Sequence, residues 1–220
     1  MFDDRRDAGT QLAARLADRG VEADVVLGIP RGGLPVAREV AAELDAPLDI
    51  IVAKKLGAPG NPEFAIGAAA SDGSVYLNEE VIEQLGVDEG YIEEERANAA
   101  ETAAEKAENY REGEPIPLEG KSVVVVDDGV ATGATAIACL RMARRADASN
   151  VVLAVPVGSP RTIDDLEAEA DEVVVVDAPA QFSAVGQFYR DFSQVSDAEA
   201  RTILREFGAD AGTDAQSPDG

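Results

Sequence analysis

The sequence predicts an α/β protein in which a central, mainly parallel sheet is flanked by helices. Short runs of β-branched residues alternate with segments of helical spacing along most of the chain. The run VVVV at 123–126 is apolar at every position, as expected of an inner strand that helices cover on both sides. Strands that alternate with helices favour a parallel sheet with right-handed crossovers.

The first elements are predicted to be a helix, a strand and a second helix. Leu12 and Leu16 lie one turn apart in a helix expected over residues 5–18. Residues 24–30, DVVLGIP, predict a buried strand that ends in the turn PRGG. The segment LPVAREVAAEL, residues 34–44, predicts the helix that follows.

A second strand and an antiparallel addition are expected next. Residues 47–57, PLDIIVAKKLG, predict a strand that leads into the glycine- and proline-rich loop GAPGNPE. FAIGAAA (64–70) and SVYLN (74–78) predict short antiparallel strands. The charged, alanine-rich residues 79–111 predict a short helix and then a long one from Asp88. Their charges are most simply a solvated face, and a dimer contact is the alternative.

The second half repeats the strand-and-helix pattern. The strands are expected at 121–127, 150–158 and 172–179. Ser159 with Pro160 predicts one helix start, and Ser196 with Glu199 forms a capping box for the last helix. We expect a single domain over residues 1–207 and a disordered tail over 208–220, which is polar and rich in glycine.

Composition excludes several classes of function. Lys and Arg number 19 against 43 Asp and Glu, which gives a net charge of -24 and argues against nucleic-acid or anionic-membrane partners. We expect a cytoplasmic protein, because the start MFDDRRDAGTQ holds no apolar run for a signal peptide or membrane span. The acidity is typical of a halophilic protein, with an ordinary acidic cytosolic protein as the alternative.

Two residue types limit the chemistry further. The chain has no histidine, so histidine acid–base catalysis and histidine metal sites are excluded. Its one cysteine, Cys139, is expected to be a small core residue and not a nucleophile.

The stretch VVVVDDGVATGAT, residues 123–135, carries the strongest functional signal. Asp127 and Asp128 end a buried strand, where two carboxylates can accept hydrogen bonds from the vicinal hydroxyls of a sugar. The backbone amides of the next loop, with the hydroxyls of Thr132 and Thr135, can bind a phosphate at a helix N-terminus. Gly133 allows close approach, and the loop lacks the lysine of a nucleoside-triphosphate P-loop.

This stretch resembles the phosphoribosyl diphosphate (PRPP) signature of the type I phosphoribosyltransferases, which implies that family's fold. The resemblance implies that Asp127 and Asp128 hold the ribose 2- and 3-hydroxyls. The 5-phosphate would be bound by Ala131, Thr132, Gly133, Ala134 and Thr135. Gly129 departs from the aliphatic residue usual there. Ala131 replaces the carboxylate of hypoxanthine-guanine enzymes, which weakens the case for a 6-oxopurine substrate.

Three further segments extend the resemblance to about residues 2–207. GIPRGG is similar to the diphosphate-binding loop, which implies that Arg31 and Gly32 contact pyrophosphate. AKKLGAPGNPE is similar to the flexible catalytic loop, with Lys54 and Lys55 as its bases. Each of these two segments alone would be an ordinary turn or a solvated strand end.

The third segment, DAPAQFSAVGQFYRDF, is similar to the hood that covers the base. It places a hood at 178–195, with Phe182 to stack on the acceptor, although Phe182 alone would be a core residue. Asp191 is a candidate Mg²⁺ or diphosphate contact, with a surface acid as the alternative. The helices of 79–111 are an insertion outside the minimal family fold.

The resemblance implies a phosphoribosyltransferase of nucleotide salvage that uses Mg²⁺. It would transfer the 5-phosphoribosyl group from PRPP to a nitrogen acceptor, a nucleobase, and release pyrophosphate. The partners would be PRPP and a small-molecule acceptor, and a homodimer is open. The alternatives are a non-catalytic PRPP- or nucleotide-binding regulator on the same fold, and PRPP hydrolysis or transfer to another acceptor. Receiver domains also carry vicinal acids, but on their first strand.

Overall fold

The computed structural model describes residues 1–111 and 113–208. Its centre is a five-stranded parallel sheet in the order β2-β1-β6-β7-β8, which confirms the predicted class. The strands are β1 (Val25–Gly28), β2 (Leu48–Ile50), β6 (Ser122–Val126), β7 (Asn150–Val157) and β8 (Glu172–Asp177). All four valines of β6 are buried, because strands flank them on both sides and helices cover both faces.

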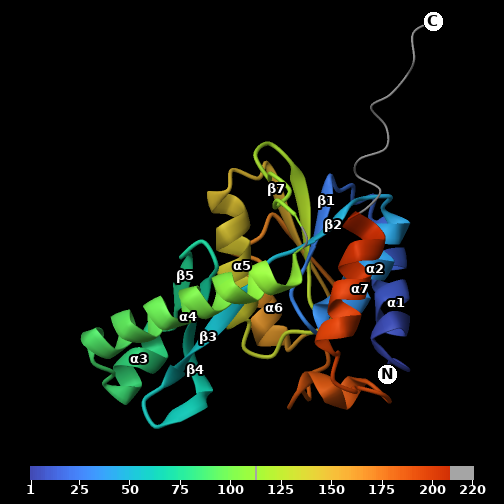
Figure 1. The fold of residues 1–220 in the computed structure, drawn as a ribbon. Helices are drawn as coiled ribbons and strands as arrows, with labels where there is room; N and C mark the ends of the chain where they lie inside the picture. Colours follow the sequence, from blue (N-terminus) through green and yellow to red (C-terminus); the bar gives the residue numbers. More distant parts are fainter. Residues whose placement is uncertain (112, 209–220) are drawn as a thin grey trace, which may run out of the picture.

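Helices form a layer on each face of the sheet (Figure 1). One layer contains α1 (Arg5–Asp18), α2 (Gly33–Glu43) and α7 (Asp197–Gly208), and the other contains α5 (Ala134–Arg145) and α6 (Pro160–Leu166). The side chains of β6 alternate between the two cores. Val124 and Val126 pack with the first layer, and Val123 and Val125 with the second. The sheet therefore holds β6 rigidly up to its last residue.

The structure contains a second, antiparallel sheet, and its first strand shows that the single strand predicted over residues 47–57 was wrong. This sheet consists of β3 (Ala53–Ala58), β4 (Asn61–Ala70) and β5 (Val75–Leu77). The strand predicted over 47–57 is two strands, because the chain leaves the parallel sheet after Ile50 and pairs with β4 from Ala53 onward. The loop predicted as GAPGNPE is only a tight turn at Pro59 and Gly60.

The predicted pair of helices follows β5 in the sequence and is confirmed as α3 (Glu79–Leu85) and α4 (Glu89–Tyr110). The side chain of Asn78 caps α3 and that of Asp88 caps α4. Helix α4 packs on β3 and β4 along its length and reaches α7. Figure 1 shows α4 crossing from the antiparallel sheet to the parallel sheet.

Residues 178–195 pack against the start of the chain. Phe2 donates its backbone N–H to the carbonyl of Phe188 at 2.8 Å and accepts from the N–H of Arg190 at 2.9 Å. Phe2, Tyr189 and Val157 form a small buried cluster with the aromatics of this segment around them. The division into a domain and a hood stays a prediction.

Two further expectations concern the chain end and membranes. Helix α7 includes Gly208, and the remainder of the predicted tail, 209–220, lies outside the described residues. Within the described part of the chain, no helix is both long and apolar enough to cross a membrane.

Candidate active site

The strand order reverses direction between β1 and β6. The chain continues from β1 to β2 on one side, and from β6 to β7 and β8 on the other. In open α/β sheets, the crevice at such a switch point, at the carboxyl ends of the strands, is where ligands bind. The loops that follow β1 and β6 meet there, and the N–H of Ile29 donates to the carbonyl of Val126 at 2.8 Å.

Two glycines let the first loop lie directly against the second. A Cβ at Gly33 would lie 2.7 Å from the carbonyl oxygen of Val126, and a Cβ at Gly32 would lie 2.1 Å from Oδ2 of Asp128. The segment PRGG therefore brings the predicted diphosphate loop against the paired carboxylates. The peptide bond between Pro30 and Arg31 in this loop is cis.

The two carboxylates have different surroundings. Burial, and then the charge of Asp128, raises the pKa of Asp127 well above its ordinary value, although Oδ1 of Asp127 accepts the N–H of Asp128 at 2.8 Å. Oδ2 of Asp128 accepts from Nε of Arg5 at 2.8 Å, and the two side chains are 14% and 11% exposed. Burial raises the pKa of Asp128 as well, and Arg5 offsets part of that effect. Asp128 thus has a protein cation as partner, whereas Asp127 has none at contact distance among the described residues.

Arg5 is a site residue that the sequence did not reveal. Its Nη1 donates to the carbonyl of Ser193 at 2.7 Å, and its guanidinium carbon lies 3.8 Å from the ring centroid of Phe192. Tyr189 adds a hydrogen bond from its hydroxyl to the carbonyl of Asp128 at 2.6 Å. The first helix and the 178–195 segment together fix the position of Asp128.

The predicted phosphate loop runs from β6 to the N-terminus of α5. Gly133 is its N-cap, with a positive φ of 74°. Thr162 of α6 donates its hydroxyl to the carbonyl of Ala131 at 2.5 Å, and Ser159 donates to that hydroxyl at 2.7 Å. Hydrogen bonds from the first turn of α6 therefore support the conformation of this loop.

Steric crowding explains why position 129, which departs from the family pattern, is a glycine. A Cβ there would lie 2.7 Å from Cγ1 of Val185 and 3.0 Å from the carbonyl oxygen of Val157. The hollow beside it, of about 140 Å³, is lined by Lys55, Asp127, Val185 and residues 129–136. All the predicted phosphate-binding residues thus border one hollow, together with one of the predicted catalytic lysines.

A larger cavity of about 490 Å³ brings the predicted lysines together with Asp127 and the phosphate loop. Its lining includes Lys54, Lys55, Asp127 and Thr135, together with Pro30 of the first loop. Both lysines are exposed on strand β3 and not on a long loop. Tyr91 and Glu95 of α4 complete the lining, and the hydroxyl of Tyr91 donates to the carbonyl of Gly57 at 3.0 Å.

Arg31 does not line these two hollows and instead contacts the start of α7. Its Nη1 lies 3.4 Å from Oδ1 of Asp197 at the start of α7. That carboxylate also accepts from the hydroxyl of Tyr110, whose pKa rises to about 12 because of burial and this hydrogen bond. In the ligand-free protein, the predicted diphosphate-binding arginine is therefore paired with an acid.

Two predicted contacts have other partners within the hood. Phe182 packs on Phe188 with ring centroids 5.2 Å apart, and it is half-buried. Asp191 is exposed and accepts the N–H of Ser193 at 2.9 Å; hydrogen bonds from Ser193 lower its pKa. Stacking by Phe182 and a metal contact at Asp191 stay predictions.

Cys139 is fully buried in α5, as expected of a core residue. Burial raises the pKa of its thiol well above the ordinary value, which disfavours the thiolate that a nucleophile needs.

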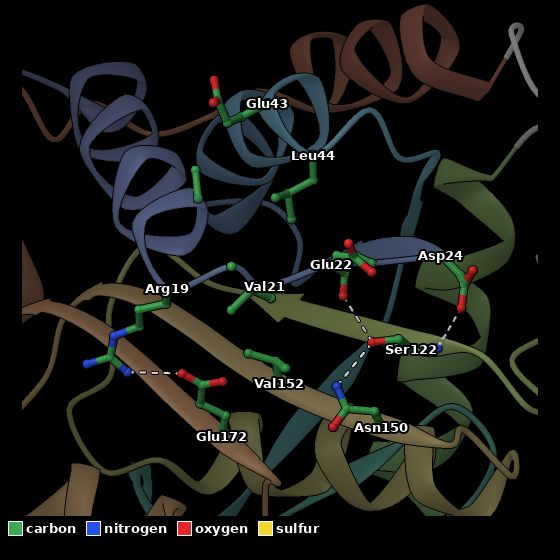
Figure 2. Close-up of a pocket in the computed structure, with 13 residues that line it drawn as sticks. Arg19, Val21, Glu22, Asp24, Glu43, Leu44, Ser122, Asn150, Val152 and Glu172 are labelled. Carbon is green, nitrogen blue, oxygen red and sulfur yellow. Dashed lines mark hydrogen bonds and ion pairs between the residues drawn. The ribbon is translucent and has the colours of Figure 1, made fainter.

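A hollow at the opposite end of the sheet has a different character (Figure 2). It measures about 810 Å³ and lies at the amino ends of the strands. Its polar groups bond to one another: the hydroxyl of Ser122 donates to the carbonyl of Glu22 at 3.1 Å, and Asp24 accepts the N–H of Ser122 at 2.8 Å. Arg19 pairs with Glu172 at 3.1 Å. These bonds fasten the strand ends, so we place the functional site at the carboxyl ends.

Comparison with known proteins agrees with this geometry. The family model "Phosphoribosyl transferase domain" matches residues 4–72 and 68–192. The chain belongs to this family. Two curated Mycobacterium tuberculosis proteins, "Putative phosphoribosyl transferase Rv0571c" and its counterpart MT0597, are each 48% identical to it over 205 residues. The match covers 93% of this chain and 46% of each relative, so the chain spans about half of their length.

A crystal structure supports the fold of the family member described here. The protein TT1426 from Thermus thermophilus is 45% identical, with a TM-score of 0.79, and the match covers 94% of this chain and 99% of that one. The sequence-based resemblance is therefore confirmed for family and fold, while the roles of individual residues stay predictions.

Proposed function

We propose that this protein transfers the 5-phosphoribosyl group of PRPP to a nitrogen acceptor, a nucleobase, and releases pyrophosphate. One observation carries the proposal. Asp127, the phosphate loop and the lysines of β3 border two hollows that share Lys55, Asp127 and Thr135, at the point where the strand order reverses.

The ribose and its phosphate would be held by groups that are already in place. Asp127 and Asp128 would offer acceptor oxygens to the two ring hydroxyls, and Arg5 favours the ionised form of Asp128 and orients it. The amides at the start of α5, with Thr132 and Thr135, suit the 5-phosphate. Binding two donors at the carboxylates would also relieve the cost of burying Asp127 as an anion.

The reaction needs charge stabilisation more than proton transfer. The bond from C1 to the diphosphate oxygen breaks, its electron pair leaves with pyrophosphate, and C1 bonds to the acceptor nitrogen, which loses its proton to solvent. Lys54, Lys55 and Arg31 would stabilise the charge on the departing group. Arg31 must leave Asp197 to do so, and this exchange would couple diphosphate binding to α7.

Mg²⁺ suits this site through its substrate. The described residues hold no cluster of three or more Asp, Glu, His or Cys that could bind a metal by itself. The hard oxygens of Asp127 and Asp128 beside the diphosphate loop are of the kind that Mg²⁺ prefers together with phosphate oxygens. When bound, the ion would neutralise diphosphate charge.

The acceptor would lie between the carboxylates and the hood. Phe182 would supply an aromatic face for it, and Ala131 lacks the carboxylate that a 6-oxopurine would favour. We also propose that the protein is cytoplasmic. We propose no nucleic-acid partner, because a net charge of -24 repels the phosphate backbone. A homodimer remains part of the proposal.

A non-catalytic PRPP-binding regulator is the second candidate. It would use the same ribose and phosphate contacts, and the pairing of Arg31 with Asp197 would suit a site that senses the diphosphate without breaking it.

The test combines calorimetric titration of Mg²⁺-PRPP with incubation of isotope-labelled PRPP and a panel of bases and amines, followed by product masses. Labelled nucleotide together with pyrophosphate would support the transferase. Binding without transfer to any acceptor would support the regulator. Absence of PRPP binding would refute both.

A further inference from the structure

We propose that Lys106 of the inserted helix α4 is a further diphosphate-binding residue, supplying a cation that the sequence motifs do not contain. The inference rests on the proposed function, since it assigns a contact to the diphosphate of the same substrate. It also gives the 79–111 helices a purpose at the site.

The packing of α4 determines where Lys106 points. Ala99, Ala103, Ala107 and Tyr110 recur at helical spacing and are all buried, so this face of α4 is fixed against the rest of the protein. Lys106 lies next to this face, one residue before Ala107. Its side chain is thereby directed at the loop after β1.

The contact with that loop is direct. Nζ of Lys106 donates to the carbonyl of Pro30 at 2.9 Å, immediately before Arg31. Residues 28–33 form the predicted diphosphate loop, so the ammonium group contacts this loop. A cavity of about 540 Å³ on this side is lined by the cations Lys106, Arg31 and Arg201 and by the acids Glu105 and Asp197, among others.

Lys106 has no carboxylate of a described residue within ion-pair distance, although helix α4 carries seven glutamates. Burial, and then the nearby charges of Arg31 and Lys54, lower its pKa, although the carboxylates of Asp127 and Asp197 act in the opposite direction. A half-buried cation beside two other cations, in a protein of charge -24, is stabilised when an anion binds between them.

The chemistry of the group matches a diphosphate. An ammonium group has three N–H donors, and the carbonyl of Pro30 takes one, which leaves donors for phosphate oxygens. Arg31 and Lys54, the residues whose charges act on Lys106, are the same residues that the motifs assign to the diphosphate. A dianionic or more highly charged ligand would bring these cations together.

The test is calorimetric titration with inorganic pyrophosphate and Mg²⁺, and separately with ribose 5-phosphate. Lys106→Met keeps the apolar stem and removes the charge, and Lys106→Arg keeps the charge. Arg96→Met on the same helix is the matched control, because Arg96 pairs with Glu93 and lies outside the cavities described. We expect Lys106→Met to weaken pyrophosphate binding by ~10-fold or more, with ribose 5-phosphate binding unchanged and Lys106→Arg close to wild type.

The outcomes separate this inference from the proposed function. If wild type binds PRPP and pyrophosphate and Lys106→Met binds pyrophosphate as tightly as Arg96→Met does, only the role of Lys106 is refuted. If wild type binds neither ligand, the proposed function falls and this inference with it. Lys106→Gln keeps a donor for Pro30 without the charge, so its full recovery of affinity would show a role in positioning the loop and overturn direct binding. It also replaces Lys106→Met if thermal melting shows that variant to be unfolded.

Discussion

Replacing Asp127 or Asp128 by asparagine should have different effects on the stability of the ligand-free protein. The pKa of Asp127 is raised by burial and by Asp128 from an ordinary value of 3.8. A carboxyl group with a raised pKa binds its proton more tightly in the folded state than in the unfolded state. Stability is therefore lost as the pH rises from near 3.8 through the raised pKa, and Asp127→Asn should remove part of this loss.

Asp128→Asn should destabilise the protein because Arg5 loses its charged partner. A hydrogen bond to a charged group contributes about 1.5–3 kcal/mol. Relief of the buried charge of Asp128 opposes this loss, and asparagine keeps an acceptor oxygen, so we expect the lower end, about 1.5 kcal/mol. For a protein of this size the melting temperature falls by about 2–4 °C per kcal/mol, which gives about 3–6 °C.

The assay is thermal melting of both single variants at pH 5 and pH 8. Asp164→Asn removes one exposed charge on α6 and serves as the control. Asp127→Asn should equal or exceed wild type, with the larger gain at pH 8, while each variant should lose ~10-fold or more in PRPP affinity. A fall in melting temperature for Asp127→Asn equal to that of Asp128→Asn at both pH values would refute the reasoning and show that both carboxylates are structural acceptors.

Three further predictions concern salt, the lysines and the phosphate loop. The melting temperature should rise steeply from dilute buffer to molar KCl, because screening weakens self-repulsion at a net charge of -24; a flat response would reject the halophilic interpretation. Replacing Lys54 and Lys55 together by alanine should reduce turnover far more than melting temperature, since both are exposed, and equal losses would indicate a structural role. Thr162→Val should remove the donor to Ala131, lower the free energy of unfolding by about 1 kcal/mol and weaken binding of ribose 5-phosphate in calorimetry; unchanged affinity would contradict the support assigned to α6.

The sequence predicted those parts of the structure that have a local cause. The helix over residues 5–18 has the predicted ends, and Asp4 caps it by accepting the N–H of Asp7 at 2.8 Å. The buried run before Asp127 could be recognised as an inner strand because every residue in it is apolar. The carboxylate pair and the phosphate loop followed from the same stretch, and the structure brings them together.

The remaining features depend on contacts between distant segments. The run LDIIVAKKL is apolar and then basic, a pattern that fits one continuous strand as well as two strands. Nothing in it therefore indicated that the chain leaves the parallel sheet after Ile50 and pairs with β4. Arg5 lies in the charged stretch DDRRD, and nothing nearby indicates its contact with Asp128. Only a weak indication in the sequence favoured a role for Lys106: it is the only lysine of residues 79–111, and it adjoins the buried alanines of α4.

The proposed ribose site joins segments that are far apart in the order of synthesis. Arg5 bonds to Asp128, 123 residues later, and to Ser193, 188 residues later. Strand β1 likewise waits for β6 before it gains its second neighbour in the sheet. On the ribosome, the carboxylates therefore emerge long before the hood that helps to hold their arginine in place. PRPP bound at the proposed site could not assist folding before the residues up to Ser193 have been translated, so earlier folding must rely on the apolar strands.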